Sequence, residues 1–354
     1  MLQLARKELC LLISSMMLYF FISFIISVFL TFLIKKFAYG AGVVDTPDTS
    51  RHLHAKPTPL LGGLAIFLSF WVTVCTVMVY FPVYGIEKII DPLMVALVGS
   101  LIIMLVGIAD DLRPFSAAIR LPLVAVAILI VTLFFPWLTK ITNPLGGYLF
   151  LANAVGSVLV FCWFLGMTYT TKILDGLDGL AAGVVSIGAF IIVLLTAVTK
   201  FYQPNVSLVA LIFLGSCLGF LLFNFHPAQI FLGESGSMFI GFMLAVLAVI
   251  GGGKLATALL VMAIPVLDVL RVMYIRIRKK QSIFSGDREH LHFRMVDAGF
   301  TQKQSVLFLY AISFFFGIAT LFLQSLQKVY ALAALIVIMV VLSHIVGKNK
   351  KTYV

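Results

Sequence analysis

Acidic residues occur in closely spaced pairs beside long apolar runs. Asp110 and Asp111 are adjacent at the end of one such run, and Asp175 and Asp178 lie three positions apart before another. Residues at that spacing share one face of a helical turn, and adjacent carboxylates repel each other unless a cation or an arginine neutralises them. Because hard cations prefer oxygen ligands, such pairs are typical of Mg²⁺ or Mn²⁺ sites near phosphates.

A fifth acid, Glu234, stands between Gly233 and Ser235 where another apolar run begins. Two interpretations remain open for it: a cap on the helix that starts there, or a metal ligand beside small donors. An EF-hand is excluded, since the twelfth position counted from Asp175 is Ser186 rather than glutamate.

Basic residues accompany these acids. The stretch 51–63 contains Arg51 and Lys56 among prolines, which hold the chain extended. It could bind a phosphate or be a solvated connector. In the stretch 276–294, His290 and His292 are two residues apart, so they do not share a helix face, and a structural zinc site is not expected. The arginines and histidines there suit an anionic nucleotide or anionic lipid headgroups.

The composition places these residues in a membrane protein. Of the 354 residues, 62% are hydrophobic and only 11% are charged, whereas a soluble domain has about 25% charged residues. Disorder, a fibrous repeat and an ordinary soluble enzyme are excluded, and the lipid bilayer is the expected surrounding. The net charge of +11 is expected from basic loops on one side of a membrane, and no nucleic acid is expected as partner.

We expect one all-α domain over residues 1–354, built from about eleven transmembrane helices. Their expected ranges are 9–34, 60–82, 92–109, 119–138, 151–168, 179–199, 206–225, 236–251, 255–275, 305–324 and 329–347. The ninth range, 255–275, contains Asp268 and Arg271, which could be a structural ion pair or functional groups inside the membrane.

The distribution of basic residues predicts the orientation. With eleven spans, 17 of the 25 Lys and Arg residues fall in loops on the side of the C-terminus. The positive-inside rule makes that side cytoplasmic and puts the N-terminus outside. On or near the same side lie 11 of the 14 acids, so we expect the chemistry at the cytoplasmic face. The loops expected to form the site are 35–59, 110–118, 169–178, 226–235 and 276–304.

Taken together, the motifs resemble those of the polyprenyl-phosphate N-acetylhexosamine-1-phosphate transferases. The likeness is greatest to the bacterial undecaprenyl-phosphate GlcNAc-1-phosphate transferases that start O-antigen, common-antigen or teichoic-acid linkage synthesis. It covers nearly the whole chain, and the motifs that carry it are Gly107-x-x-Asp110-Asp111, Asp175-Gly-x-Asp178-Gly-Leu, Asn224-x-x-Pro227-Ala-x-x-Phe-x-Gly233 and Asp287-Arg-x-His290-x-His292.

The resemblance implies an enzyme of the bacterial inner membrane that uses Mg²⁺ or Mn²⁺. It would transfer GlcNAc-1-phosphate from UDP-GlcNAc to undecaprenyl phosphate, releasing UMP. The implied catalytic residues are Asp110, Asp111, Asp175 and Asp178. The implied metal ligands are Asp111, Asp175 and Glu234. The candidate substrate-binding residues are Arg51, Lys56, Arg120, Lys172, Asn224, Arg288, His290 and His292. The oligomeric state is left open, with a homodimer as one alternative.

Several positions depart from the family pattern. The family usually has asparagine at the positions of Tyr169 and Lys172, aspartate where Glu234 stands, and a third histidine at Phe293. These changes leave open another UDP-hexosamine, UDP-MurNAc-pentapeptide, or a non-catalytic lipid-phosphate-binding paralogue. The incomplete histidine motif argues against the muramoyl-pentapeptide alternative. A transporter is disfavoured, because the charges gather at one face rather than at the bilayer midplane.

Overall fold

The computed structural model describes residues 2–47, 56–80, 85–134, 138–143, 147–199, 201–252, 254–282 and 288–348. Most of them are helical. The helices are α1 (Leu2–Gly40), α2 (Gly62–Tyr80), α3 (Ile90–Leu112), α4 (Ala117–Phe134), α5 (Asn153–Leu174), α6 (Leu180–Val198), α7 (Pro204–Asn224), α8 (Gly233–Ile250), α9 (Leu255–Val261), α10 (Ala263–Arg278), α11 (Leu291–Asp297), α12 (Gln302–Phe322) and α13 (Ser325–Lys348), with a short 3₁₀ helix over Ile86–Ile89.

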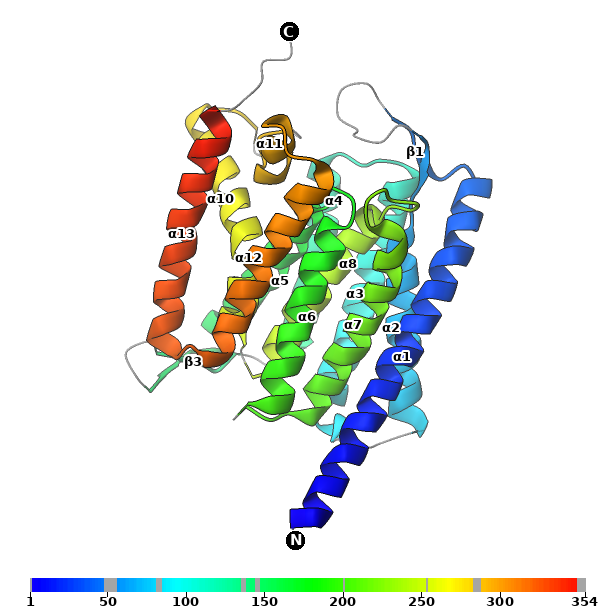
Figure 1. The fold of residues 1–354 in the computed structure, drawn as a ribbon, viewed down its shortest axis with the longest axis vertical. Helices are drawn as coiled ribbons and strands as arrows, with labels where there is room; N and C mark the ends of the chain where they lie inside the picture. Colours follow the sequence, from blue (N-terminus) through cyan, green and yellow to red (C-terminus); the bar gives the residue numbers. More distant parts are fainter. Residues whose placement is uncertain are drawn as a thin grey trace.

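Two small antiparallel hairpins complete the described elements. In one, β1 (Val44–Asp45) pairs with β2 (Thr58–Pro59), and in the other β3 (Lys140–Thr142) pairs with β4 (Tyr148–Phe150). The β1–β2 hairpin returns the chain from the end of α1 to the start of α2. It lies at the same end of the helix bundle as α11, whereas β3 lies near the other end (Figure 1).

The expected all-α membrane architecture is confirmed. Within the described residues, ten helices are long and apolar enough to cross a membrane, and the bent pair α9–α10 makes an eleventh if it counts as one span. The start of α1 and the end of α13 lie at opposite ends of the bundle (Figure 1), as an odd number of crossings requires. Which of the two ends faces the cytoplasm stays a prediction.

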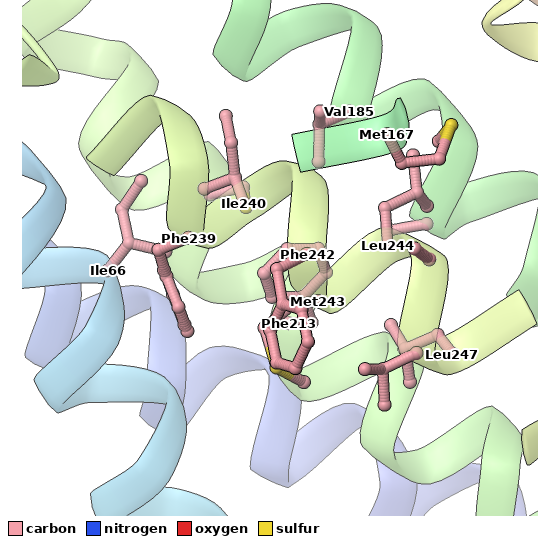
Figure 2. Close-up of a cluster of buried hydrophobic side chains, with 14 of the residues drawn as sticks. Ile66, Met167, Val185, Phe213, Phe239, Ile240, Phe242, Met243, Leu244 and Leu247 are labelled. Atoms are coloured by element: carbon pink, nitrogen blue, oxygen red, sulfur yellow. The ribbon is translucent and has the colours of Figure 1, made fainter. Parts of the chain in front are cut away.

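Helix α8 forms the centre of the bundle. It packs against α2, α3, α5 and α6. In its apolar 18-residue stretch 83% of the residues are buried, whereas only 17% are buried in the corresponding stretch of α13. Figure 2 shows Phe239 and Phe242 of α8 among side chains of the neighbouring helices. An apolar helix that is buried all round has neighbours on every side, so the residue that begins α8, Gly233, is fixed in place by several helices.

The expected single helix over 255–275 is wrong in one respect: it is broken. Helices α9 and α10 meet at an angle of 76°. Pro265 explains the break, because a proline ring lacks an N–H and clashes with the carbonyl four residues earlier. That carbonyl belongs to Val261, the last residue of α9. The break redirects α10 and with it Asp268.

Glycines let α2 and α3 approach the start of α8 closely. A Cβ on Gly63 would overlap the backbone of Gly236, and one on Gly107 would overlap the backbone of Ser235. The backbone N–H of Gly63 also donates a hydrogen bond to the carbonyl of Leu232 (2.9 Å). These contacts hold the ends of α2 and α3 against the first turn of α8, where Glu234 lies.

Candidate active site

A pocket of about 460 Å³ opens where these helix ends meet. All five predicted site loops contribute to its wall. The lining residues are Asp45, Leu60, Asp110, Asp111, Pro114, Arg120, Lys172, Asp175, Gly176, Leu177, Asp178, Asn224, Phe231, Gly233, Glu234, Ser237, Phe293 and Gln302. Six carboxylates from four separate segments of the chain therefore share one cavity with two basic side chains.

Asp110 is a buried acceptor that fastens the turn between α3 and α4. Its carboxylate forms an ion pair with Arg120 of α4 and accepts a hydrogen bond from the backbone N–H of Phe115. Because a buried charge is tolerated when it is paired and hydrogen-bonded, this arrangement is stable in itself. Asp110 thus positions Arg120 at the pocket.

Asp111 caps α8 from outside that helix. One carboxylate oxygen accepts the backbone N–H of Glu234 (2.7 Å), and the other accepts the backbone N–H of Ser235 (3.2 Å) and its hydroxyl (2.7 Å). The first N–H groups of a helix have no partner within it, and a negative charge there also offsets the helix dipole. Asp111 therefore fixes the start of α8, although it lies at the end of α3.

Asp178 and Asn224 fasten two further loops of the pocket to each other. Asp178 Oδ2 is 2.7 Å from His226 Nδ1 and accepts the backbone N–H of Ala228 (3.0 Å). Asn224 accepts the N–H of Gly179 (3.1 Å) and donates to the carbonyl of Ile230 (2.9 Å). Both side chains line the pocket, but their polar atoms hold the protein backbone together.

Asp175 and Glu234, by contrast, keep carboxylate oxygens without hydrogen-bond partners. Within the described residues, Asp175 makes no side-chain hydrogen bond, and Oε2 of Glu234 is buried without a partner. Burial raises the pKa of Asp175 to about 8, and the negative charges of Glu234, Asp111 and Asp178 act in the same direction, against the charge of Lys172. A cation or a proton would stabilise this carboxylate.

Two basic side chains stand against Glu234. Its Oε1 is 3.0 Å from Nζ of Lys172 and 3.3 Å from Nη1 of Arg120. In the part of the chain that the structure describes, Nε of Arg120 and the hydroxyl of Tyr169 are buried without hydrogen-bond partners. These unused donors beside the pocket suit a ligand rich in oxygen atoms, such as a phosphate.

The donor set fits a divalent cation that is shared with a substrate. Among the described residues, no group of three or more His, Cys, Asp or Glu side chains is placed to hold a metal ion by itself. Mg²⁺, however, is usually bound by one or two carboxylates together with substrate phosphates and water. Asp175 and the unpartnered oxygen of Glu234 can act in that way, whereas both oxygens of Asp111 already accept hydrogen bonds.

The two histidines of the last loop are held next to the pocket rather than in its wall. Asp268 Oδ2 is 2.9 Å from His290 Nδ1 and accepts the N–H of Leu291 (3.0 Å), while Arg271 pairs with Oδ1 (2.9 Å). Asp268 and Arg271 are thus an ion pair that also anchors the start of α11. Positioned this way, the ring of His292 stacks on that of His290.

His292 reaches toward the second acidic motif. A Cβ on Gly176 would come within 2.5 Å of its Nε2, and this nitrogen is buried without a hydrogen-bond partner among the described residues. Burial lowers the pKa of His292 to about 3 against the negative charge of Asp268, and His290 and Arg288 act in the same direction as burial. The ring is therefore neutral at physiological pH.

The remaining predicted residues lie outside the cavity wall. Lys56 is exposed, and Arg288 pairs with Asp297 (2.6 Å) and covers the ring of Phe293. Neither is among the residues that line the pocket. Arg51 falls outside the described residues, as does Asp287 of the histidine motif.

Some residues of the site were not singled out from the sequence. His226 was visible beside Pro227, but nothing in the sequence indicated that it would pair with Asp178. Ser235 was noted only as a small neighbour of Glu234, although its hydroxyl binds Asp111. Both contacts join segments that are far apart along the chain, and no short-range spacing carries such information.

Comparison with known proteins agrees with this geometry. Residues 93–252 match the family described as glycosyl transferase family 4. That range runs from α3 to α8 and contains all the acids that line the pocket except Asp45.

Relatives match over much greater lengths. A protein of Bacillus subtilis (strain 168) named probable undecaprenyl-phosphate N-acetylglucosaminyl 1-phosphate transferase is 32% identical, over 93% of this chain and 91% of its own length. Decaprenyl-phosphate N-acetylglucosaminephosphotransferase of Mycobacterium tuberculosis is 32% identical over 81% of this chain and 77% of its own length. The Escherichia coli (strain K12) undecaprenyl-phosphate alpha-N-acetylglucosaminyl 1-phosphate transferase is 28% identical, with shares of 80% and 77%. The chain therefore belongs to glycosyl transferase family 4, together with the polyprenyl-phosphate N-acetylglucosaminyl 1-phosphate transferases, and is a multi-pass membrane enzyme.

Proposed function

We propose that this enzyme transfers N-acetylglucosamine 1-phosphate from UDP-GlcNAc to undecaprenyl phosphate. The products are undecaprenyl-diphospho-GlcNAc and UMP, and the reaction is the first membrane step of a cell-surface polysaccharide. We place it at the cytoplasmic face of a bacterial inner membrane. The observation that carries the proposal is the pocket in which Asp175 and Glu234 meet Arg120 and Lys172 at the ends of membrane-spanning helices.

The proposed reaction exchanges one phosphoanhydride bond for another. An oxygen of the lipid phosphate attacks the phosphorus that carries the sugar, a P–O bond forms there, and the bond from this phosphorus to the bridging oxygen of UMP breaks. Negative charge develops on the departing UMP, so positive charge near the diphosphate lowers the barrier. Lys172 and Arg120 supply such charge from the side of Glu234.

The carboxylates divide the remaining work. Asp175 and Oε2 of Glu234 would hold Mg²⁺ or Mn²⁺, which when bound stabilises charge on the diphosphate. Asp110, Asp111 and Asp178 keep the helix ends and loops in place through the hydrogen bonds described above. His292 lies buried behind Gly176 as a neutral group, next to the wall of the pocket.

A transfer assay tests the proposal. Membranes containing the protein are incubated with radiolabelled UDP-GlcNAc, undecaprenyl phosphate and Mg²⁺ or Mn²⁺. We expect label in a butanol-soluble lipid, with one UMP released per sugar phosphate transferred. Membranes without the protein are the control, and omission of undecaprenyl phosphate must abolish the lipid product.

The donor is varied in the same assay, because Lys172 and Glu234 line the pocket where the family usually has other residues, and Tyr169, a third such position, precedes Lys172 on α5. UDP-GalNAc and UDP-MurNAc-pentapeptide are each offered in place of UDP-GlcNAc. A higher rate with either would replace the proposed donor and keep the reaction class. No lipid product with any of the three donors would contradict the proposal.

A further inference from the structure

The pocket contains its own fixed positive charge at the carboxylate that would bind a metal. Nζ of Lys172 lies 3.0 Å from Oε1 of Glu234, and both side chains are mostly withdrawn from water, with 16% and 32% of their surface exposed. Arg120 is the second cation at the same oxygen. Oε1 of Glu234 is therefore engaged by the protein itself before any ligand enters.

A divalent ion at Glu234 has to accommodate these neighbours. Mg²⁺ requires oxygen ligands at about 2.1 Å, and of the two carboxylate oxygens of Glu234 only Oε2 has no partner among the described residues. An ion held at Oε2 would share the Glu234 carboxylate with the Lys172 ammonium group, which contacts its other oxygen. Since the interaction of charges grows as the local dielectric constant falls, the repulsion between the two cations is strong in this partly buried site.

The same ammonium group can act on a phosphate. Lys172 lines the pocket beside Asp175 and belongs to the last turn of α5, a rigid helix, so its charge is placed without the ordering cost of a mobile loop. A lysine is a point charge with three donors that can bind phosphate oxygens directly. Its contact with Glu234 keeps the charge at the pocket while the substrate is absent.

We infer that Lys172 carries part of the charge stabilisation otherwise left to a divalent cation, and that it weakens the binding of such a cation to the pocket. This inference rests on the proposed function for the role of the diphosphate. The part concerning cation binding can be measured without turnover. In short, the Lys172–Glu234 pair sets how strongly the enzyme depends on metal.

Manganese binding tests the inference directly. Free Mn²⁺ is titrated by electron paramagnetic resonance against the purified full-length protein, its variants K172Q and K172R, and the control K303Q, which removes an exposed lysine outside the pocket wall. We expect K172Q to bind Mn²⁺ roughly ten-fold or more tightly than the parent, and K172R and K303Q to bind it as the parent does. Adding D175N to K172Q should remove the gain. Equal affinity of the parent and K172Q would overturn the inference.

Transfer with the metal removed is the second measurement, and the result for the parent protein does not depend on the folding of any variant. We expect the parent protein to keep a rate above background in excess EDTA, comparable with that of D175N, and K172Q to lose roughly 30-fold more than the parent under the same conditions. A parent rate that falls to background in EDTA and returns with Mg²⁺ would overturn the inference and leave the transferase proposal standing. If no donor gives transfer, the proposed function fails, and the Mn²⁺ titration still decides the cation-binding part.

Discussion

At the scale of single residues, the five predicted acids of the pocket are of two kinds. Asp110, Asp111 and Asp178 accept hydrogen bonds from backbone N–H groups and hold helix ends or loops. Asp175 and the second oxygen of Glu234 do not. All five could be identified from type and position in the sequence, but their division could not, because the partners of the structural acids lie up to 124 residues away along the chain.

This division predicts that neutralising Asp175 and neutralising Asp111 have different effects on the transfer rate and on stability. In D175N the transfer rate should fall about 100-fold or more, whereas the thermal midpoint in detergent should stay the same or rise, because a buried and repelled carboxylate is removed. The two measurements are made on one preparation at pH 7.5. A lowered midpoint in D175N would mean that Asp175 is structural as well.

For D111N we expect losses in both measurements. One oxygen that accepts backbone N–H groups of α8 becomes an amide donor, which should cost about 1–3 kcal/mol of stability. Turnover should be nearly abolished, because the first turn of α8 carries Glu234. A fully active and fully stable D111N would remove Asp111 from both roles.

The neutral state of His292 predicts a dependence of stability on pH. Its pKa in the folded protein is about 3, below the ordinary value of 6.5, so the unfolded chain binds more protons at any pH between these values. Stability therefore falls as the pH falls through 6.5 toward 3, and this residue alone should cost about 2 kcal/mol by pH 5. The thermal midpoint of the parent protein is compared with that of H292Q at pH 7.5 and pH 5.

The expected result is a smaller acid loss in H292Q than in the parent, whatever the absolute midpoint of the variant. His344 provides the control, because it is exposed on α13, and H344Q should keep the full pH dependence. An identical change between the two pH values in the parent and H292Q would show that His292 does not remain neutral in the folded state.

At the scale of elements, hydropathy was enough to find the helices, because each must cover its backbone polar groups and present apolar side chains to lipid. It could not show that one expected helix is two, α9 and α10. Pro265 was the visible signal, but proline is common within membrane spans and does not by itself specify a 76° bend. Nor does hydropathy show which helix ends touch, and that depends on small residues such as Gly107.

Gly107 should therefore tolerate no larger side chain. A methyl group at this position overlaps the backbone of Ser235, so G107A must push α3 away from the first turn of α8 and disturb Asp111. We expect a lower thermal midpoint and a transfer rate reduced about ten-fold or more. G166A is the matched control, since Gly166 is exposed on α5 and a Cβ there meets nothing within 4 Å; its midpoint and rate should equal those of the parent.

At the scale of the whole molecule, the site arises where five connecting segments meet at one end of the bundle. The segregation of the acids to one side was readable from the sequence once the spans were assigned. Their convergence on a single cavity was not, because it depends on α8 being central and on α2 and α3 closing on its start. The distribution of lysines and arginines along the chain predicts which end of the bundle faces the cytoplasm, which the arrangement of the helices leaves open.

The orientation in the membrane is the last prediction, and the labelling of introduced cysteines measures it. Ser116 follows α3 and is exposed at the pocket end of the bundle, close in sequence to Pro114 of the cavity wall. Glu87 is exposed in the 3₁₀ helix that precedes α3, at the opposite end of that helix. With the native cysteines replaced, S116C in intact cells should resist a membrane-impermeant maleimide until the cells are lysed, whereas E87C should react at once, because the basic loops that flank the pocket are retained in the cytoplasm. The reverse pattern would put the pocket outside, away from cytoplasmic UDP-sugars, and would contradict the proposed reaction together with the orientation.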